Sequence, residues 1–396
     1  MYPRPNLIPR FNLDYTFKDF CHALKSIFTN DFEPKILGKL FDKCDFFFTN
    51  NGRSALYVIL KALNLPRGSK IGVPLYSCTA VFDAIVKAGY VPCFVDIELD
   101  SYTLSPCDLD DKIDGMDAVV VIHTFGYPAE MDRIKKVATD RPVIEDCAHS
   151  LCSKYKGKIT GTLSFASFFS FKKYTSTGEG GMIILNDDKL REDIKREVNL
   201  LTEVSMMEEI YNCFVTYLHS VTYHKPWYGL FTFPIGSIIK DLDGSNSKRR
   251  DFKATKIKKT DLYVFLRKLI DFERKVERQR KNSKILEEEL KDTSLILLYE
   301  AKDIWWNYYL FPVRFESKNQ RDKAHKLLRN MGIDTAKLYS TTPNAAKKFY
   351  GYKGKGDCQN SEHCADTILV IPNYYTLTEQ EILKIARSVR RVEELI

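Results

Sequence analysis

The fold is decided by one stretch of the chain, Phe165-Ala166-Ser167-Phe168-Phe169-Ser170-Phe171-Lys172-Lys173-Tyr174-Thr175-Ser176-Thr177-Gly178-Glu179-Gly180-Gly181. An apolar run ends abruptly at two lysines, and a glycine-rich turn follows. We predict a strand over residues 165–171 with the lysines at its carboxyl edge, where an amine can be partly desolvated and its pKa lowered. A basic surface loop is the alternative interpretation of this stretch taken alone.

The neighbouring sequence alternates short apolar runs with amphipathic segments from residue 50 to 190, which is typical of an α/β fold with a parallel sheet covered by helices. The predicted strands are 70–73, 93–96, 118–123, 143–145, 165–171 and 182–185, and the predicted helices are 53–63, 79–88, 129–138 and 187–198. In such sheets ligands bind at the carboxyl ends of the strands, so we expect the chemistry at that edge.

Two further motifs fall at this edge. The run Val143-Ile144-Glu145-Asp146-Cys147-Ala148-His149 ends a buried strand with an acid and, three residues on, a histidine. The run Thr49-Asn50-Asn51-Gly52-Arg53-Ser54-Ala55-Leu56 is a polar glycine turn that opens a helix, whose free amides and positive dipole end suit a phosphate. Taken singly, each motif is also explained by an ordinary strand-end acid or by helix capping.

Together the three motifs meet the demands of pyridoxal 5'-phosphate (PLP). This cofactor needs a lysine to form an imine, an acid to keep its pyridine nitrogen protonated, amides for its phosphate and contacts for its ring. The lysine pair, Asp146 and the turn at Gly52 supply candidates for the first three, and His149 could bond the phenolic oxygen.

With these motifs the chain resembles the DegT/DnrJ/EryC1/StrS sugar aminotransferases. The resemblance also covers the segments 73–77, 87–96, 123–132, 332–335, 370–372 and 377–379. It implies a three-layer PLP-transferase fold of type I, with a mostly parallel central sheet and a smaller α+β C-terminal domain. It further implies a homodimer that transfers an amino group, with glutamate as the expected donor, to a nucleotide-linked keto sugar.

The resemblance also implies roles for residues at matched positions. Lys173 would be the Schiff-base lysine, Asp146 would pair with the pyridine nitrogen, and His149 would lie near the ring oxygen. The phosphate would be held by Gly52, Arg53, Ser54 and Ser170. Cys78 stands where a ring usually stacks on the cofactor, and the substrate-side candidates are Tyr76, which could supply that ring, and Glu179.

Two features depart from the family pattern. The spacing before the lysine is two residues short, which favours Lys173 but leaves Lys172 as an alternative. Relatives carry an asparagine that reaches the phosphate of the other subunit, whereas here the matching stretch 251–256 has none. Lys253 or Lys256 could supply charge instead.

We expect two domains, a large PLP-binding domain over 1–255 and a unit over 256–396 with a long bridging helix (256–291) and a small C-terminal domain. That unit should contain a strand at 308–313 and a last helix opened by a Thr378–Glu381 capping box. An aromatic-rich insert spans about 203–250, with a loop at 241–250. Its segment 211–239 is too interrupted to span a bilayer, so we expect it to cover a partner or, less favoured, a membrane surface.

Composition narrows the class of protein. The chain has 396 residues and a net charge of +8 that is scattered, so we expect no nucleic-acid partner. Ten cysteines without a C-x-x-C pair indicate reduced thiols, and residues 1–10 do not resemble a signal peptide, so we expect a cytoplasmic location. Cys358, His363 and Cys364 fit no standard zinc spacing, and no metal is expected.

Two alternatives to the sugar aminotransferase stay open. One is another PLP enzyme of the same fold acting on a different substrate, such as a deoxysugar dehydratase, although Lys173 argues against a dehydratase because histidine replaces the lysine there. The other is a catalytically silent homologue that binds a sugar nucleotide. The irregular lysine spacing and Cys78 keep this second alternative open.

Overall fold

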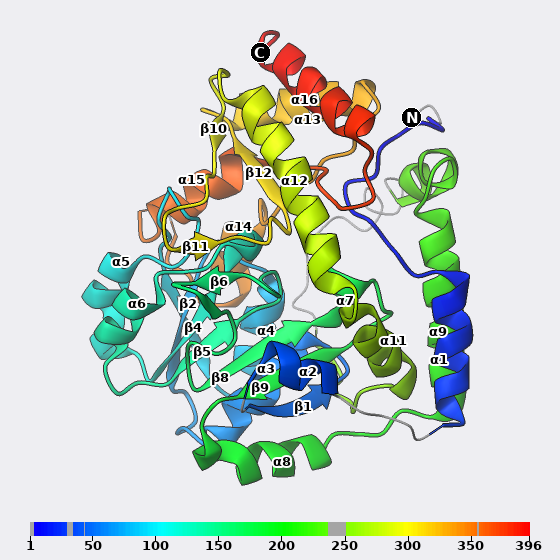
Figure 1. The fold of residues 1–396 in the computed structure, drawn as a ribbon. Helices are drawn as coiled ribbons and strands as arrows, with labels where there is room; N and C mark the ends of the chain where they lie inside the picture. Colours follow the sequence, from blue (N-terminus) through cyan, green and yellow to red (C-terminus); the bar gives the residue numbers. More distant parts are fainter. Residues whose placement is uncertain (1–3, 30–34, 43, 237–250, 355) are drawn as a thin grey trace.

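The computed structural model describes residues 4–29, 35–42, 44–236, 251–354 and 356–396, and shows an α/β architecture with helices on both sides of a large sheet (Figure 1). In spatial order the strands of this sheet are β1 (Asp45–Thr49), β9 (Gly181–Leu185), β8 (Ala166–Ser170), β5 (Val143–Asp146), β4 (Ala118–Ile122), β2 (Lys70–Pro74) and β3 (Val91–Val95).

Most neighbours in this sheet run parallel, as the sequence predicts. The pairs β8–β5, β5–β4, β4–β2 and β2–β3 are parallel, whereas β9 runs antiparallel to both β8 and β1. The six predicted strands are confirmed with small shifts at their ends. The sequence prediction missed β1, because a short run such as Phe46-Phe47-Phe48 has no periodicity that separates strand from helix.

The four predicted helices of the large unit are also present. They are α3 (Gly52–Ala62), α4 (Thr79–Lys87), α6 (Met131–Ala138) and α8 (Arg191–Asn199), the last preceded by a 3₁₀ turn, Asp188–Leu190. The remaining elements before residue 200 are α1 (Phe17–Ile27), α2 (Lys35–Leu40), α5 (Pro106–Lys112), η1 (Ile113–Gly115), η2 (Thr124–Gly126), β6 (Lys154–Tyr155), β7 (Lys158–Ile159) and α7 (Phe171–Thr175).

The long bridging helix predicted over 256–291 is wrong as a single helix. The structure has α11 (Lys259–Leu269) and α12 (Phe272–Leu290), separated at Ile270 and Asp271. Both helices contribute to the core beneath the large sheet, where Phe272 and Val276 of α12 pack with α11, and only the later part of α12 enters the core of the C-terminal unit. Residues such as Phe265 in α11 pack beneath the large sheet, whereas Leu286 of α12 packs in the core of the C-terminal unit, and Ile270 between them is exposed.

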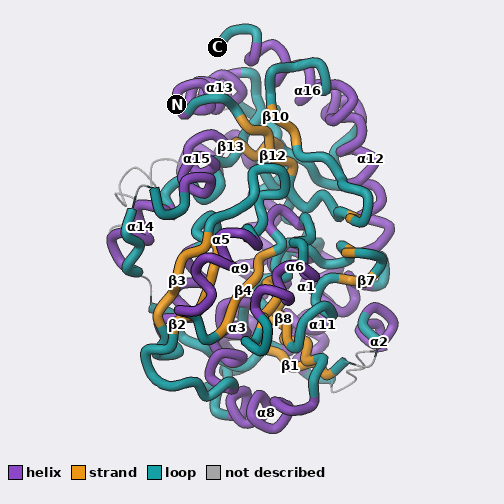
Figure 2. The backbone as a smooth tube through the Cα atoms, turned by 90° about the vertical axis from the view of Figure 1, so that its left-hand side faces the viewer, coloured by secondary structure: helices purple, strands orange, loops and turns teal. Residues whose placement is uncertain are grey.

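The C-terminal unit contains a small antiparallel sheet, β10 (Ile296–Leu297), β12 (Phe311–Arg314) and β13 (Ile368–Ile371), with α13 (Lys318–Asn330), α14 (Thr342–Phe349), α15 (Gln359–Thr367) and α16 (Glu379–Glu393). Figure 2 shows this sheet at the end of the molecule opposite α8, with α12 running along one side. A further strand, β11 (Ile304–Trp305), pairs with β6. The domain boundary at 255/256 stays a prediction.

Two expectations for this unit have different outcomes. The capping box is confirmed, since the Thr378 side chain accepts from the Glu381 amide and Glu381 reaches back to Thr378. The strand predicted over 308–313 begins only at Phe311, because Tyr308 adopts a left-handed backbone with φ 51°, which strands do not use.

The insert begins with a helix, α9 (Met206–Thr222), which lies beside α1 at one edge of the molecule (Figure 1) and leads to a π-helical turn, η4 (Tyr228–Thr232). Within the described ranges, no helix is both long and apolar enough to cross a membrane. The loop predicted at 241–250 lies outside the described residues.

Candidate functional site

A cavity of about 500 Å³ opens at the carboxyl edge of the parallel strands. Strand ends and helix starts of the large unit form its floor, and residues 338–342 of the C-terminal unit form its roof. Among the residues predicted from the sequence, the cavity is lined by Gly52, Arg53, Cys78, Asp146, His149, Ser170, Lys172, Lys173 and Glu179. The structure therefore brings together residues that are up to 127 positions apart in the chain, from Gly52 to Glu179.

The start of α3 makes one end of this cavity suitable for an anion. The Asn51 side chain caps the helix by accepting from the Ser54 amide at 2.9 Å. A β-carbon on Gly52 would meet the Ser170 β-carbon at 3.2 Å and the Phe169 carbonyl oxygen at 3.3 Å, so glycine lets β8 approach the helix start. The positive end of the helix and Ser170 meet at the cavity here, which suits a phosphate.

The other two predicted phosphate residues are placed differently. Ser54 does not line the cavity but lies buried just beneath it, and its hydroxyl has no partner among the described residues. The Arg53 guanidinium is held on the outer side, 3.5 Å from Asp83 and 4.8 Å from the centre of the Phe252 ring. The backbone of Arg53 is thus better placed than its side chain to bind a ligand.

Asp146, at the end of β5, forms the acidic end of the site. Its side chain is buried, and one carboxylate oxygen accepts a hydrogen bond from the Ala148 amide at 2.8 Å. Burial raises the pKa of this carboxyl to about 6, although the Ala148 amide and the positive charge of Lys173 oppose the shift. A cationic ring nitrogen placed against Asp146 would offset the cost of burying its charge.

His149 lies next to Asp146 and is buried, with its ring stacked on Tyr309 at 4.8 Å between ring centres. Burial, with a contribution from the Lys173 charge, holds the pKa of this imidazole well below its usual value, so the ring is neutral. Its Nδ1 atom has no hydrogen-bond partner among the described residues. An unpartnered polar atom in a buried position is what a site for a polar ligand is expected to show.

The two lysines lie on α7, so the strand predicted over 165–171 is corrected at its end. Phe171 stacks on Phe265 of α11 at 3.5 Å between ring centres, and the Thr175 hydroxyl donates to the Phe171 carbonyl at 3.1 Å, which holds this segment as a helical turn. Both lysine side chains are exposed in the single chain. The Lys173 charge acts on Asp146 and His149, whereas the Lys172 charge acts on His219 of α9.

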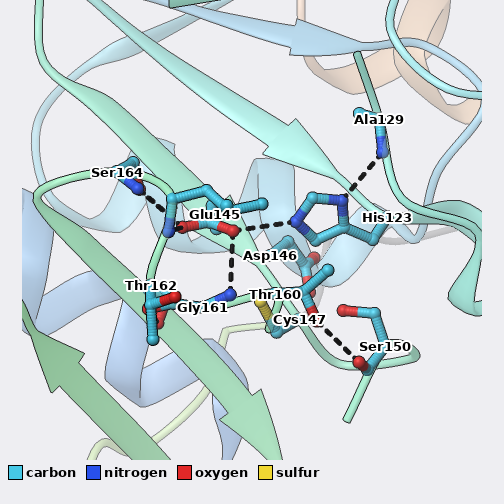
Figure 3. A network of polar contacts seen from close by, with 12 residues as sticks. His123, Ala129, Glu145, Asp146, Cys147, Ser150, Thr160, Gly161, Thr162 and Ser164 are labelled. Carbon is cyan, nitrogen blue, oxygen red and sulfur yellow. Dashed lines mark hydrogen bonds and ion pairs between the residues drawn. The ribbon is translucent and has the colours of Figure 1, made fainter. Parts of the chain in front are cut away.

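A buried polar network supports β5 beneath the site (Figure 3). Glu145 accepts hydrogen bonds from the Gly161, Leu163 and Ser164 amides, the Ser164 hydroxyl and His123 Nε2, at 2.8–3.1 Å. The Ala129 amide donates to His123 Nδ1 at 3.0 Å, so Nε2 carries the ring proton. This network fixes the strand end that carries Asp146.

The same network contains a group of possible metal ligands. Within the part of the chain that the structure describes, His123, Glu145 and Cys147 form a group whose ligand atoms lie within 4.8 Å of one another. Both His123 nitrogens and both Glu145 oxygens are already used in hydrogen bonds. We therefore interpret the group as a structural network rather than a metal site.

Sequence reasoning missed a ring that lines the cavity. The structure does not place Tyr76 in the cavity, because its ring is fully buried and its hydroxyl donates to the Leu338 carbonyl at 3.3 Å. Instead Tyr339 lines the cavity with Cys78, and its ring meets the Tyr76 ring edge-on at 5.3 Å. Tyr339 also has a left-handed backbone, with φ 57°. No local motif around Tyr339 indicates this contact, which depends on how the two units pack.

Glu179 and the lysines before α11 have in-chain partners. Glu179 lies 3.1 Å from the amine of Lys258, a buried lysine that the sequence analysis did not single out. Lys256 pairs with Glu203 at 2.9 Å. The Lys253 side chain is exposed, and its carbonyl oxygen accepts from the Asn50 amide group at 3.2 Å. The structure of the single chain assigns neither Lys253 nor Lys256 to the phosphate end.

The site thus offers an amine, a buried carboxyl, a neutral imidazole and a helix start with a spare serine hydroxyl. These groups fit a planar cationic ring that carries a phosphate. The unpartnered atoms, Ser54 Oγ and His149 Nδ1, are the observations that test this fit, because each is buried and lacks a partner among the described residues.

Comparisons with known proteins identify the family of this chain. The model of the DegT/DnrJ/EryC1/StrS aminotransferase family matches residues 28–390. A GDP-perosamine synthase from Escherichia coli O157:H7 is 40% identical over 146 residues, which are 36% of this chain and 40% of that relative. A UDP-N-acetyl-3-dehydro-alpha-D-glucosamine 3-aminotransferase from Acidithiobacillus ferrooxidans is 24% identical over 90% of this chain and 92% of that relative.

The fold also matches solved structures. A Streptococcus pneumoniae protein solved in its PLP form superposes with a TM-score of 0.76 at 17% identity, covering 98% of this chain and 99% of that one. A likeness at this identity supports the type I fold, and the family match supports the activity. The chain therefore belongs to the DegT/DnrJ/EryC1/StrS aminotransferase family, and it is a PLP-dependent aminotransferase.

Proposed function

We propose that this enzyme transfers an amino group from an amino acid, with glutamate as the expected donor, to a nucleotide-linked keto sugar. The observation that carries the proposal is the single cavity in which Lys173 acts on a buried Asp146 and a neutral His149. The names of the relatives, which include GDP-linked and UDP-linked sugar enzymes, support the substrate class.

Each group at the cavity floor has a proposed task in holding the cofactor. Bound PLP supplies an electron sink that stabilises negative charge on the carbon next to the transferred nitrogen. Asp146 would keep the ring nitrogen protonated, because the two opposite charges stabilise each other in a buried place. His149 would donate to or accept from the ring oxygen, and Ser54, Ser170 and the amides at Gly52 would bind the phosphate.

Lys173 is proposed as the catalytic lysine. Its exposed amine on α7 lies within electrostatic reach of both Asp146 and His149, so it can attach the cofactor and carry a proton between neighbouring atoms. The nearest alternative, Lys172, lines the same cavity but acts on His219 of α9. The two side chains thus differ in which titratable groups they approach, which supports Lys173 for this task.

The sugar nucleotide would enter between the two units. Tyr339, Thr341 and Thr342 of the C-terminal unit line the roof, and Glu179 lines the opposite wall with its carboxylate anchored by Lys258. Hydroxyl and carboxylate groups of this kind bind sugar hydroxyls by hydrogen bonds. We propose Glu179 as a substrate contact. In the single chain Tyr76 acts only through Tyr339, as a positioning residue.

The test is a two-stage transfer assay on the PLP-loaded protein. The enzyme is first given single amino acids, and the aminated form is then mixed with GDP-linked or UDP-linked 3-keto and 4-keto sugars while mass spectrometry follows the aminated product. Glutamate with one nucleotide-linked keto sugar should give product, and Lys173→Ala should give none. Product from simple 2-keto acids but from no sugar nucleotide would contradict the proposed substrate class.

A further inference from the structure

The glycine-rich turn that follows the two lysines, residues 178–181, is held by the start of α11. Helix α11 lies beside α7, which carries the lysines (Figure 1). Asp261, in the first turn of α11, accepts a hydrogen bond from the Gly178 amide at 3.0 Å through its Oδ1 atom. The backbone of the turn is therefore attached to a buried acid that lies 83 positions away in the chain.

Glycine at position 178 allows this attachment. A β-carbon there would meet the Thr216 hydroxyl oxygen of α9 at 2.5 Å and Asp261 Oδ1 at 3.2 Å. A larger residue would have to push the turn away from both helices, and the hydrogen bond to Asp261 would lengthen. The residue at this position therefore keeps the turn within reach of Asp261.

The other end of the turn is fixed by backbone hydrogen bonds. The Gly180 amide donates to the Asn50 carbonyl oxygen at 2.6 Å, and the Gly180 carbonyl oxygen accepts from the Phe171 amide at 2.9 Å. Glu179, which lies between the two held glycines, lines the cavity. Its side chain therefore starts from a backbone whose position is set on both sides.

The Glu179 side chain is held by a second residue at the start of α11. The Lys258 amine lies 3.1 Å from Glu179 Oε2 and 3.9 Å from Asp261 Oδ2, and the Lys258 side chain is only 4% exposed. A buried positive charge needs negative partners to offset the loss of water. Lys258 thus links the acid that holds the turn to the acid that the turn carries into the cavity.

Asp261 is not explained by the capping of its own helix. Acids in the first turn of a helix are common because they offset the helix dipole. In a capping box, an acid at this position accepts from the backbone amide of the N-cap residue, which is Lys258 here. Asp261 binds the Gly178 amide instead. Its carboxylate is therefore directed at the wall of the cavity.

One oxygen of Glu179 is available to a ligand. Oε2 accepts from Lys258, whereas Oε1 has no hydrogen-bond partner among the described residues. A carboxylate oxygen accepts a hydrogen bond from a hydroxyl group and repels a second carboxylate. A keto sugar offers hydroxyl groups near its carbonyl, whereas the expected amino donor, glutamate, carries two carboxylates. The free oxygen therefore suits the sugar better than the amino acid.

We propose that Asp261 and Lys258 are positioning residues for the keto-sugar half of the reaction. They hold Glu179 so that its free oxygen accepts a hydrogen bond from a hydroxyl group of the sugar. The same carboxylate disfavours a dicarboxylate in that place, so the arrangement favours the sugar over a 2-keto acid as amino acceptor. The inference rests on the proposed function, because it takes a nucleotide-linked keto sugar as that acceptor.

The experiment compares two keto acceptors on one aminated enzyme. The PLP-loaded protein is first aminated with glutamate. The return of its visible absorption band is then followed with the keto sugar that the wild type aminates, or with 2-oxoglutarate, the keto acid that glutamate leaves behind. Lys258→Met should raise the half-saturation concentration of the sugar about 10-fold and change its maximal rate less than about twofold. The half-saturation concentration of 2-oxoglutarate should change less than about twofold.

Two substitutions of Asp261 separate its hydrogen bond from its charge. Burial raises the pKa of Asp261 to about 7, so the neutral acid, which asparagine resembles, is already present near neutral pH. Asp261→Asn keeps an acceptor for the Gly178 amide, and its half-saturation concentration for the sugar should stay within about threefold of the wild type. Asp261→Leu removes the acceptor and should raise that concentration about 10-fold. Circular dichroism checks the folding of each variant.

A double-variant cycle tests whether Lys258 acts through Glu179. Glu179→Gln alone should raise the half-saturation concentration of the sugar about 10-fold. Adding Lys258→Met to it should change that concentration by less than about twofold, because the contact is already lost. Lys291→Met is the matched control. It removes a lysine paired with Glu288 at the end of α12 and should change the kinetics with neither acceptor.

Four results would overturn the inference. The first is a wild-type half-saturation concentration of the sugar in Lys258→Met. The second is an equal loss with the sugar and with 2-oxoglutarate, which would make the two residues a general support of the site. The third is additive effects of Lys258→Met and Glu179→Gln. The fourth is an Asp261→Asn variant as impaired as Asp261→Leu.

A failure of the proposed function looks different in the same assay. A wild type that is aminated by glutamate but reacts with no nucleotide-linked keto sugar would contradict the proposed function, and this inference with it. A wild type that aminates the sugar, together with any of the four results, would contradict the inference alone.

Discussion

At the scale of single residues, the site depends on how Asp146 is held. Its carboxylate is buried at the end of β5 with one amide donor, so its ionised form lacks the hydrogen bonds that water would supply. Burial therefore raises its pKa to about 6. Such a carboxylate suits a protein that binds a cationic ring, because the electrostatic attraction between the carboxylate and the ring is strongest where water is excluded.

The raised pKa of Asp146 predicts a pH dependence of the cofactor-free protein. The folded state holds this proton more tightly than the unfolded chain, so stability falls as pH rises from about 4 through about 6. Asp146→Asn removes the buried charge. Its advantage in unfolding free energy over the wild type should grow across that window to about 3 kcal/mol and then stay level. Urea unfolding of both proteins from pH 4 to pH 8 measures this difference.

The same substitution should weaken PLP binding, which equilibrium dialysis measures. A stability difference that is flat from pH 4 to pH 8 would contradict the description of Asp146 as a buried acid that titrates near 6.

Glu145 shows a different way to hold a buried carboxylate. Five hydrogen-bond donors surround its two oxygens, and these hydrogen bonds replace the water that burial removes. Glu145→Gln puts an NH₂ group against some of these donors and should lower the free energy of unfolding by ~3 kcal/mol. Denaturant titration measures this, and Glu192→Gln at an exposed position should change it by less than ~0.5 kcal/mol. Equal losses in the two variants would contradict a supporting role for the Glu145 network.

At the scale of elements, the phosphate end depends on a close crossing between β9 and the turn before α3. A β-carbon on Gly181 would lie 2.8 Å from the Gly52 nitrogen and closer still to the Asn51 carbonyl group. The β9 strand can therefore pass the turn only with glycine at this position. The crossing fixes the amides at Gly52 relative to β8, which carries Ser170.

We expect Gly181→Ala to disturb this crossing. The added methyl group must push the Asn51 turn away, so the affinity for PLP should fall about 10-fold or more while the sheet still forms. Fluorescence titration with PLP measures the affinity. Gly115→Ala is the matched control, because a β-carbon there meets nothing within 4 Å. Unchanged PLP binding in Gly181→Ala would contradict the assignment of the phosphate to the α3 start.

The elements themselves were largely predictable from the sequence. Runs such as 118–122 are apolar and end at polar residues, which marks both the strand and its functional edge. The break between α11 and α12 was not predictable, because apolar positions at helical spacing continue through it. After Phe272 and Val276, which share a core with α11, the later part of α12 enters the core of the C-terminal unit. The spacing of apolar residues does not show which core they will face.

At the scale of the whole molecule, the cavity is assembled from both units. Its floor was predicted from motifs because Gly52, Asp146 and Lys173 each follow a recognisable run of sequence. Its roof was not, since Tyr339 is 261 positions away from Cys78 in the chain yet lines the same cavity. The Tyr76 hydroxyl, bonded to the Leu338 carbonyl, holds this roof segment in place. Such contacts depend on how the units pack.

The measurement that tests the central claim most directly is the visible absorption spectrum of the purified protein after incubation with PLP, with Lys173→Ala and Lys172→Ala beside it. The account predicts a band in the wild type and in Lys172→Ala that shifts when glutamate is added, and no such band in Lys173→Ala. A wild type without the band, or a band lost in Lys172→Ala but kept in Lys173→Ala, would contradict the assignment of Lys173 as the catalytic lysine.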